Sequence, residues 1–363
     1  MRYHERPHNV DPHIDKLRVI LAIKNFAKIK GVCHIGLGVT AENTLQVLRR
    51  NGIFAEAWAT ESYAELRAQL SSETKKNDYH PITHVIVSSP AWITPNQFHD
   101  LCSLYGQIEF VMLSHSGTSY LSIDFHGIQN IKGDIENTLS HHNMIVAANN
   151  PRSVKAFDGM FGNHTVYLPN LYDTTRFMPF THPKPIGHTL RVFNPGASRP
   201  WKNQLTAAQG AIILARRLGV NLEYYVNSKR PDGGERMIES RGELFRDLPG
   251  ATITDVPWMP WPKFRSFCAT MNLLVEPSFD ETFNVCVADA YAAGIPAVTS
   301  PSIEWAPRES WCEPCDPSSI VHVGMNLLHN PHAVHDGRAA LQEYASQGIH
   351  HWKRYLLREE HPI

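Results

Sequence analysis

Short apolar runs that alternate with longer amphipathic stretches constrain the fold of this chain more than any other feature. In the first half, strand-like runs occur at Arg18–Ile23, Ile53–Ala57, His84–Ser88, Ile108–Leu113 and Met144–Ala148, and helix-like stretches at Ala41–Arg50, Tyr63–Leu70, Pro95–Tyr105 and up to Phe161. The first run could also open an amphipathic helix, but its length and β-branched residues favour a strand buried on both faces. Such alternation is typical of a parallel sheet with helices on both faces.

The second half repeats the pattern. Strands are expected at Leu190–Asn194, Glu223–Val226, Thr252–Val256 and Leu273–Val275, and helices at Gln204–Leu218, Arg236–Leu244 and Pro262–Ala269. The segment PFTHPKPIG, residues 179–187, holds three prolines and a glycine, which indicates a linker. With 363 residues, two domains are expected. The sequence therefore predicts an α/β protein of two Rossmann-like, doubly wound domains that face a central cleft. They would span residues 1–180 and 188–335, and helices in residues 336–363 would cross back to the first domain.

Composition narrows the class of protein. Hydrophobic residues make up 42% and charged residues 19%, which is usual for a soluble globular chain. The formal net charge of −1 gives no overall field that would attract nucleic acid or an anionic membrane, although a local basic patch is possible. No apolar run approaches the roughly 18 residues of a membrane span, and the first thirty residues lack a signal-peptide pattern. The scattered cysteines suggest reduced thiols and a cytoplasmic location.

The stretch EPSFDETFNVCVADAYAAGIPAVTS, residues 276–300, places acids where a buried strand ends and a helix begins. Asp280 and Glu281 precede the helix, and Asp289 lies about two turns beyond Glu281. Unpaired amides at the helix start can hold a phosphate, and carboxylates accept hydrogen bonds from paired sugar or ribose hydroxyls. Alternatively, Asp280 and Glu281 only cap the helix and Asp289 is solvated.

A second segment, FNPGASRPWKNQLTAAQGA at residues 193–211, combines a strand, a glycine-containing turn and a helix. Arg199 and Lys202 lie in the turn, where two cations suit a diphosphate that gains charge as a bond to it breaks. They could also be ordinary solvated cations near a helix start, where the helix dipole mildly disfavours them. Taken together with the acids, the two cations favour a site for a phosphorylated sugar.

These motifs resemble those of the large retaining nucleotide-sugar glycosyltransferase family (family 4-like), whose two-Rossmann fold is called GT-B. Glu281 matches the first acid of the family's glutamate–seven residues–glutamate signature, and Asp289 stands at the second. SRPWKN, residues 198–203, resembles the family's Arg/Lys diphosphate clamp, which often has a longer Arg–Lys spacing.

The first half is similar to the family in two further segments. VMLSHSG, residues 111–117, resembles the strand that ends in a histidine beside the donor sugar, which is His115 here. YLPNLYDTTRF, residues 167–177, is similar to the segment that ends the first domain, with Leu171 where a glycine is common.

The resemblance implies a role for each matching residue. Glu281 would contact sugar hydroxyls and Asp289 the ribose, while Arg199 and Lys202 would neutralise the leaving diphosphate. The amides of Thr282, Phe283 and Asn284 would hold the sugar or the β-phosphate, and the base would stack near Trp258 and Met259. The implied reaction is transfer from a nucleoside diphosphate sugar, expected to be a UDP-sugar, to an acceptor hydroxyl with retention. It would need no metal, no other cofactor and no protein nucleophile.

The sequence GLGVTA, residues 36–41, supports an alternative of another class. It fits a loose dinucleotide-binding fingerprint, with Glu56 downstream as a ribose ligand, and would make the chain an NAD-dependent oxidoreductase. The fingerprint expects the strand to abut these glycines, whereas residues 24–35 separate them here. In the favoured interpretation, Gly36 and Gly38 let their loop approach the donor or the acceptor closely.

The sequence gives less information about the acceptor than about the donor. Lys24, Lys28 and Lys30 form either a solvated basic surface or a site for an anionic acceptor, such as a phospholipid head group or DNA with hydroxymethylated bases, as in phage-type DNA glycosylation. Two further alternatives are a sugar-nucleotide-binding relative without activity and a metal or redox site at Cys312 and Cys315. No second cysteine pair completes such a metal site.

Overall fold

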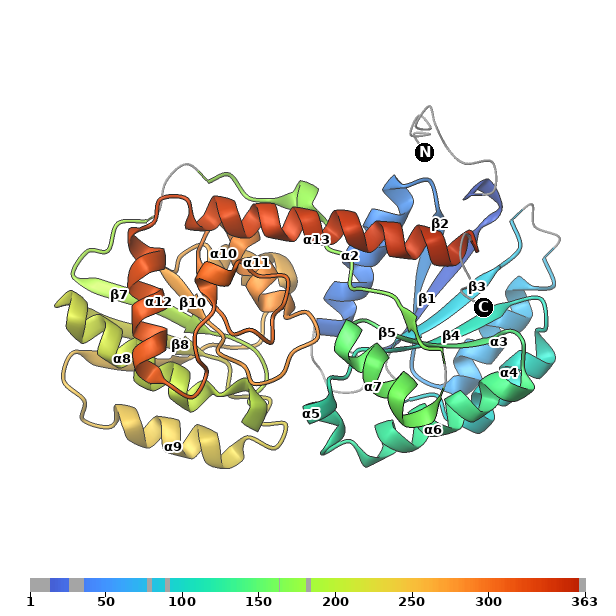
Figure 1. The fold of residues 1–363 in the computed structure, drawn as a ribbon, viewed down its shortest axis with the longest axis horizontal. Helices are drawn as coiled ribbons and strands as arrows, with labels where there is room; N and C mark the ends of the chain where they lie inside the picture. The colour runs from blue at the N-terminus through green and yellow to red at the C-terminus, as the bar shows by residue number, and fades with distance from the viewer. Residues whose placement is uncertain are drawn as a thin grey trace. The chain divides into compact units, whose positions relative to one another are not determined.

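A computed structural model describes residues 14–25, 36–76, 80–88, 92–162, 164–180 and 184–358 (Figure 1). The chain divides into two compact units, and each has its own sheet. The first unit takes the described residues of Met1–Asp173 and Ala345–Ile363, and the second takes those of Thr174–Tyr344. The long helix α13 (Ala333–Leu356) therefore supplies residues to both units.

The first unit contains a six-stranded parallel sheet in the order β2-β1-β3-β4-β5-β6. Its strands are β1 (Arg18–Lys24), β2 (Phe54–Thr60), β3 (His84–Ser88), β4 (Glu109–Ser114), β5 (Met144–Ala148) and β6 (Val166–Tyr167). Its helices are η1 (Ile14–Lys16), α2 (Gly36–Arg50), α3 (Tyr63–Glu73), α4 (Pro95–Leu104), α5 (Thr118–Leu121), α6 (Phe125–Ser140) and α7 (Pro151–Phe161). The order of the strands reverses between β1 and β3, because the chain leaves β1 for β2 on one side and returns to β3 on the other.

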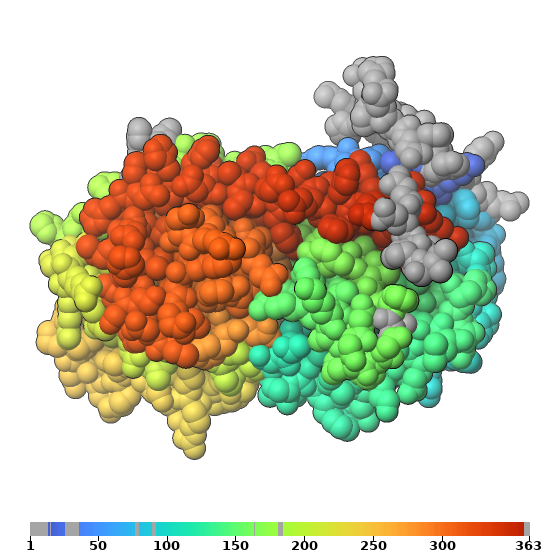
Figure 2. All heavy atoms as spheres, viewed as in Figure 1, coloured from blue at the N-terminus to red at the C-terminus, as the bar shows by residue number. Residues whose placement is uncertain are grey.

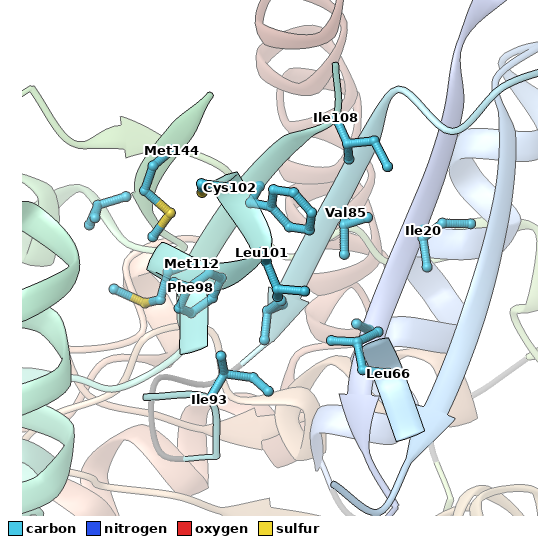
Figure 3. Packing of buried hydrophobic residues seen from close by; sticks show 14 of the residues in the cluster. Ile20, Leu66, Val85, Ile93, Phe98, Leu101, Cys102, Ile108, Met112 and Met144 are labelled. Atoms are coloured by element: carbon cyan, nitrogen blue, oxygen red, sulfur yellow. The ribbon is translucent and has the colours of Figure 1, made fainter. Parts of the chain in front are cut away.

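Alternate residues of these strands enter two separate cores, as the pleat of a strand requires. On one face, Val85 and Met112 pack with Phe98 and Leu101 of α4 and with residues of α3, α6 and α7 (Figure 3). On the other face, neighbouring strand residues such as Ile86 pack with residues of α2 and of the last turns of α13. Helices thus cover both faces of the sheet, as the near-continuous apolar strands predict.

The second unit contains a five-stranded parallel sheet in the order β11-β10-β7-β8-β9. Its strands are β7 (Thr189–Asn194), β8 (Asn221–Val226), β9 (Ala251–Asp255), β10 (Leu273–Val275) and β11 (Ala297–Val298). Its helices, besides the start of α13, are η2 (Thr174–Arg176), η3 (Pro200–Lys202), α8 (Gln204–Leu218), α9 (Glu235–Phe245), α10 (Trp261–Cys268), α11 (Val285–Ala293), η4 (Arg308–Ser310) and α12 (Pro317–His329). Here the order of the strands reverses between β7 and β10.

The second sheet also separates two cores. Val192 and Val275 pack with residues of α8 and α12 on one face, whereas Phe193 and Leu274 pack with residues of α10 and α11 on the other. Helix α9 lies at the surface of this unit (Figure 2, yellow), and Arg241 and Phe245 are its buried residues. Among the described residues, no helix combines the length and the apolar character needed to span a bilayer.

The predicted alternation of strands and helices is confirmed, with local differences. The sequence pattern predicts no element between Leu113 and Met144, whereas the structure has α5 and α6 there. Glycines reduce the helix propensity of α6, yet Gly133 is needed there, because a Cβ on it would lie 2.5 Å from Cγ of Pro95 in α4. The predicted start of the first long helix at Ala41 is wrong, because α2 begins at Gly36.

Candidate functional site

The carboxyl ends of β7 and β10 carry a group of charged and amide side chains in contact with one another. Asn194 is the last residue of β7, and Glu276 directly follows β10. Lys202 closes the short helix η3 after β7, and Glu281 and Asn284 lie between β10 and α11. In open parallel sheets, ligands bind outside the carboxyl ends of the strands at the point where the strand order reverses, and this point lies between β7 and β10.

Lys202 is a buried ammonium shared by two carboxylates. Its side chain forms an ion pair with Glu281, and its Nζ lies 3.4 Å from Oε2 of Glu276. The residue is only 8% exposed. Burial acts to lower the pKa of Lys202, but the charges of Glu276 and Glu281 outweigh it and hold the pKa above its ordinary value. The ammonium therefore stays protonated at all moderate pH values.

Glu276 is the fully buried acid of this group, with 0% of its surface exposed. Nδ2 of Asn284 donates to its Oε2 at 3.1 Å, and Nδ2 of Asn194 lies 3.4 Å from its Oε1. Burial raises the pKa of Glu276 to about 7, since it outweighs the lowering effect of the Lys202 ammonium. Glu276 therefore changes its charge near neutral pH.

Asn284 connects the two carboxylates to the start of α11. Its Nδ2 donates to Oε1 of Glu281 at 3.3 Å as well as to Glu276, and its Oδ1 caps the helix by accepting from the amide of Val287 at 3.1 Å. Its φ of 60° lies in the left-handed region, which asparagine tolerates better than most residues. Ser278 donates to the same oxygen of Glu281 at 3.2 Å. Local backbone geometry thus holds Glu281 in place.

Arg199 precedes η3 and forms an ion pair of its own. Its Nη2 and Nε lie 2.9 and 3.2 Å from Oδ2 of Asp232, which also accepts from Arg230 at 3.3 Å. The loop after β8 supports this segment, because the amide of Ser198 donates to the carbonyl of Arg230 at 2.8 Å. Gly234 packs so closely that a Cβ on it would lie 2.6 Å from the carbonyl carbon of Ser198.

The carboxylate of Asp289 accepts hydrogen bonds from the indole of Trp261. Nε1 of Trp261 lies 2.9 and 3.0 Å from its two carboxylate oxygens, and the residue is almost completely buried within α11. Each of these oxygens can accept a second hydrogen bond. The guanidinium of Arg230 lies 5.2 Å from the ring of Trp258, and Met259 packs at the edge of the core behind α10 and α11.

Phe283 precedes α11 and anchors the loop that carries Glu281. Its ring is buried and stacks on Tyr344 with the ring centroids 5.2 Å apart, while its carbonyl accepts from Nε1 of Trp305 at 2.6 Å. Thr282 is partly buried between Glu281 and this anchor.

Four of the predicted site residues described by the structure lie in the first unit. His115 follows β4, and its Nδ1 lies 3.2 Å from Nδ2 of Asn149, which follows the neighbouring β5. Burial lowers the pKa of His115 to about 4, despite a hydrogen bond with Asn170 that acts in the opposite direction. Its imidazole is therefore neutral at pH 7.

The remaining first-unit residues lie near α2 and β1. Gly36 and Gly38 are in the first turn of α2, where a loop was expected, and Lys24 ends β1. Lys28 and Lys30 lie outside the described residues.

The two cysteines of the Cys312–Cys315 segment lie in different environments. Cys312 is buried, which raises its thiol pKa to about 12, whereas Cys315 is exposed. Within the described ranges, no three His, Cys, Asp or Glu side chains converge in a way that could hold a metal ion.

The structure brings Lys202, Glu281 and Asn284 together, while Arg199 is paired with Asp232 and Asp289 with Trp261. Sequence reasoning missed Glu276, Asn194 and Arg230. Glu276 could have been found, because it is an acid that directly follows a fully buried strand in a parallel sheet.

Comparison with known proteins gives matches in structure alone. No protein-family model matches the chain, and no curated protein sequence does. Sucrose-phosphate synthase from Thermosynechococcus elongatus superposes with a TM-score of 0.61 at 14% identity, over 94% of this chain and 100% of that one. HepE from Anabaena, in complex with UDP and glucose, gives a TM-score of 0.60 at 12% identity, over 93% and 98% of the two chains. An α,α-trehalose-phosphate synthase (UDP-forming) from Burkholderia vietnamiensis gives 0.59 at 12% identity, over 94% and 99%. The predicted GT-B fold class, with two α/β units, is confirmed.

Proposed function

We propose that this protein transfers a sugar from a nucleoside diphosphate sugar to an acceptor hydroxyl, and that the second unit binds the donor. The observation that carries the proposal is the buried Lys202–Glu276–Glu281 group at the β7/β10 reversal, where ligands of parallel sheets bind. Support comes from proteins of the same fold, since structures of HepE contain UDP, glucose or UDP-glucose.

The proposed roles of the cations follow from the charge that develops on the leaving diphosphate. As the bond between the sugar and the diphosphate breaks, the leaving phosphates gain negative charge, and cations fixed beforehand stabilise that charge without reorganisation. Lys202 is fixed by two carboxylates and Arg199 by Asp232. Backbone amides at the start of α11 would assist by holding the β-phosphate.

The polar groups around the cations would position the donor. We assign Glu281 to the sugar hydroxyls, Asp289 to the ribose and Trp258 to the base. We further propose that the donor is a UDP-sugar and that no metal takes part. A phosphate oxygen of the leaving group would deprotonate the acceptor on the departing face, so that configuration is retained without a protein nucleophile.

The acceptor would bind the first unit. We place it near Lys24, which ends β1 beside the point where the order of the first sheet reverses. The cationic Lys24 suits an anionic acceptor, of which DNA is one form. Binding of such an acceptor would weaken steeply with added salt, whereas an uncharged acceptor would bind independently of salt.

Ligand-induced thermal stabilisation tests the donor class. UDP-glucose, UDP-N-acetylglucosamine and GDP-mannose are compared with NAD, because any ligand of the folded state raises its stability by mass action. We expect at least one nucleotide sugar to raise the Tm and NAD to leave it unchanged. Stabilisation by NAD alone would contradict the proposal.

The variant Arg199→Ala tests the role of the cations. We expect donor turnover to fall about a hundredfold or more, equivalent to roughly 3 kcal/mol of transition-state stabilisation, with little change in Tm. Arg191→Ala is the matched control, because Arg191 forms an ion pair with Glu223 on an exposed stretch of β7 and β8. Equal turnover in the two variants would remove Arg199 from the mechanism.

A further inference from the structure

In the reaction as proposed, Glu276 only helps to fix Lys202 and contacts no reacting atom, although it is the fully buried carboxylate of the site. Its contacts are with Lys202, Asn284 and Asn194, at 3.4, 3.1 and 3.4 Å respectively. Glu281 is bound to the same ammonium. When both acids are ionised, two negative charges share one positive charge, and the three side chains are at most 12% exposed.

A donor diphosphate would add more negative charge beside this ammonium. Lys202 cannot by itself balance two carboxylates and a diphosphate, and Arg199, the other proposed cation, already pairs with Asp232. An uncompensated charge in a buried site is strongly unfavourable. A buried acid avoids that cost most readily by accepting a proton. Glu276 is suited to do so, because it is fully buried and its pKa is already about 7.

The other titratable groups that face Glu276 cannot take this role. They are Lys202 from η3, Glu281 from the loop before α11, Cys286 from α11 and Tyr224 from β8. Lys202 is already protonated, since its pKa is raised. Burial raises the pKa of Cys286 and of Tyr224 well above their ordinary values, so both are neutral near pH 7. Glu281 would be engaged by the donor sugar itself.

We propose that Glu276 takes up one proton from solvent when a nucleoside diphosphate sugar binds beside Lys202, which frees the ammonium to pair with the phosphates. The carboxylate becomes a carboxylic acid, and no other bond is made or broken. Glu276 is therefore a positioning residue that acts through Lys202. This inference rests on the proposed function and couples donor binding to the uptake of a proton.

Proton uptake makes donor binding depend on pH. Protonation of Glu276 favours the bound state, so the donor should bind more weakly as pH rises from 7 to 9. In Glu276→Gln, an uncharged amide imitates the protonated acid, and the dependence on pH should become flat.

Isothermal titration calorimetry with UDP-glucose at pH 7.5 measures the uptake. The two phosphates of UDP-glucose are both esterified and do not titrate near neutral pH. The observed heat is compared across buffers with different ionisation enthalpies, and the slope gives the number of protons taken up. For the wild type we expect a positive uptake of less than one proton per ligand, because part of the Glu276 population is already protonated at this pH. Glu276→Gln should bind with no uptake, and the control Glu223→Gln, on a partly exposed edge of β8, should keep the wild-type value.

Difference infrared spectroscopy of the wild type gives a readout that needs no variant. Binding should convert a carboxylate band into a protonated carboxyl band. UDP-glucose binding without proton uptake, or with equal uptake in Glu276→Gln, would overturn the inference and leave the proposed function intact. If no nucleotide sugar binds at all, the proposed function fails, and the inference fails with it.

Discussion

At the scale of single residues, two buried acids meet different surroundings. Glu276 lies among an ammonium and two amides, whereas neither carboxylate oxygen of Asp134 in α6 of the first unit has a hydrogen-bond partner among the described residues. Among the ion pairs of the described residues, none includes Asp134, and its side chain is fully buried. Burial raises the pKa of Asp134 to about 8. Asp134 therefore lowers the stability of the fold as soon as it ionises.

Asp134→Asn should stabilise the protein at alkaline pH. In the unfolded chain the carboxyl has a pKa near 3.9, so between about pH 4 and 8 the folded state holds a proton that the unfolded state has released. Wild-type stability falls as pH rises through this window, and asparagine removes that loss. We expect the gain at pH 8 to exceed the gain at pH 5 by roughly 3–4 kcal/mol, measured by urea unfolding.

The exposed carboxylate of Asp100 on the neighbouring helix α4 provides the control. Asp100→Asn should leave the pH dependence of unfolding unchanged. If Asp134→Asn gave the same gain at pH 5 and pH 8, ionisation of Asp134 would not be the cause.

The sequence points to some residues of the candidate site more readily than to others for a physical reason. Lys202, Glu281 and Asp289 occur in turns and helices with a recognisable spacing, so their chemistry is visible in the sequence. Glu276 was missed because its importance comes from burial and from partners such as Asn194, which is 82 positions away. Such a partnership exists only after β7 and β10 pair.

At the scale of elements, α9 supports the loop that carries Arg199. The backbone at Gly234, just before α9, packs against Ser198, and the amide of Ser198 is held by the carbonyl of Arg230. A glycine is required here for space, since any Cβ would meet backbone atoms that cannot rotate away. The position of Arg199 thus depends on the start of a helix that begins 36 residues later.

Gly234→Ala should therefore displace Arg199 and reduce activity. The added Cβ pushes the Ser198 backbone away, and misplacement of a catalytic group by about 1 Å can cost about a hundredfold in rate. We expect turnover of the nucleotide sugar to fall by tenfold to about a hundredfold, and the Tm to fall modestly. Steady-state kinetics of the purified variants measures the effect.

Gly242→Ala in the same helix is a matched control, because its Cβ would meet no atom within 4 Å. It should retain wild-type turnover and gain roughly 0.5–1 kcal/mol of stability, since alanine favours the helix. Equal turnover in the Gly234 and Gly242 variants would show that α9 does not position Arg199.

Elements with strong apolar periodicity were predicted well from the sequence, whereas α6 and the first turn of α2 were not. Gly36 and Gly38 in α2 and Gly127 and Gly133 in α6 lower local helix propensity. Tertiary contacts offset this, since Leu45 and Leu48 of α2 and Ile131 and Ile135 of α6 are buried against the first sheet. Such contacts are not visible in a local window of sequence.

At the scale of the whole molecule, the alternating pattern was enough to predict two parallel sheets. Each short apolar strand can bury its two faces only against the helices that alternate with the strands along the chain. The chain does not divide at a single point, however. The first unit is completed by residues from 345 onward, which return to it through α13. Trp352 is buried in the core of α2 and the first sheet, and its Nε1 donates to the carbonyl of Pro169 at 2.8 Å.

Trp352→Ala should destabilise the first unit by about 3–5 kcal/mol, because it removes a large buried side chain and leaves a cavity. Hydrogen exchange should show faster exchange in β1 and β4, whereas β7 and β8 should keep their protection, since their core contains no residue of this part of α13. Affinity for the nucleotide sugar, measured where the variant is folded, should stay near the wild-type value, because every donor contact assigned to the second unit remains. Trp352→Phe fills most of the volume but loses the bond to Pro169, so it should cost less, about 1–2 kcal/mol. Equal loss of protection in both sheets would mean that the two units unfold together, and that α13 couples them into one cooperative structure.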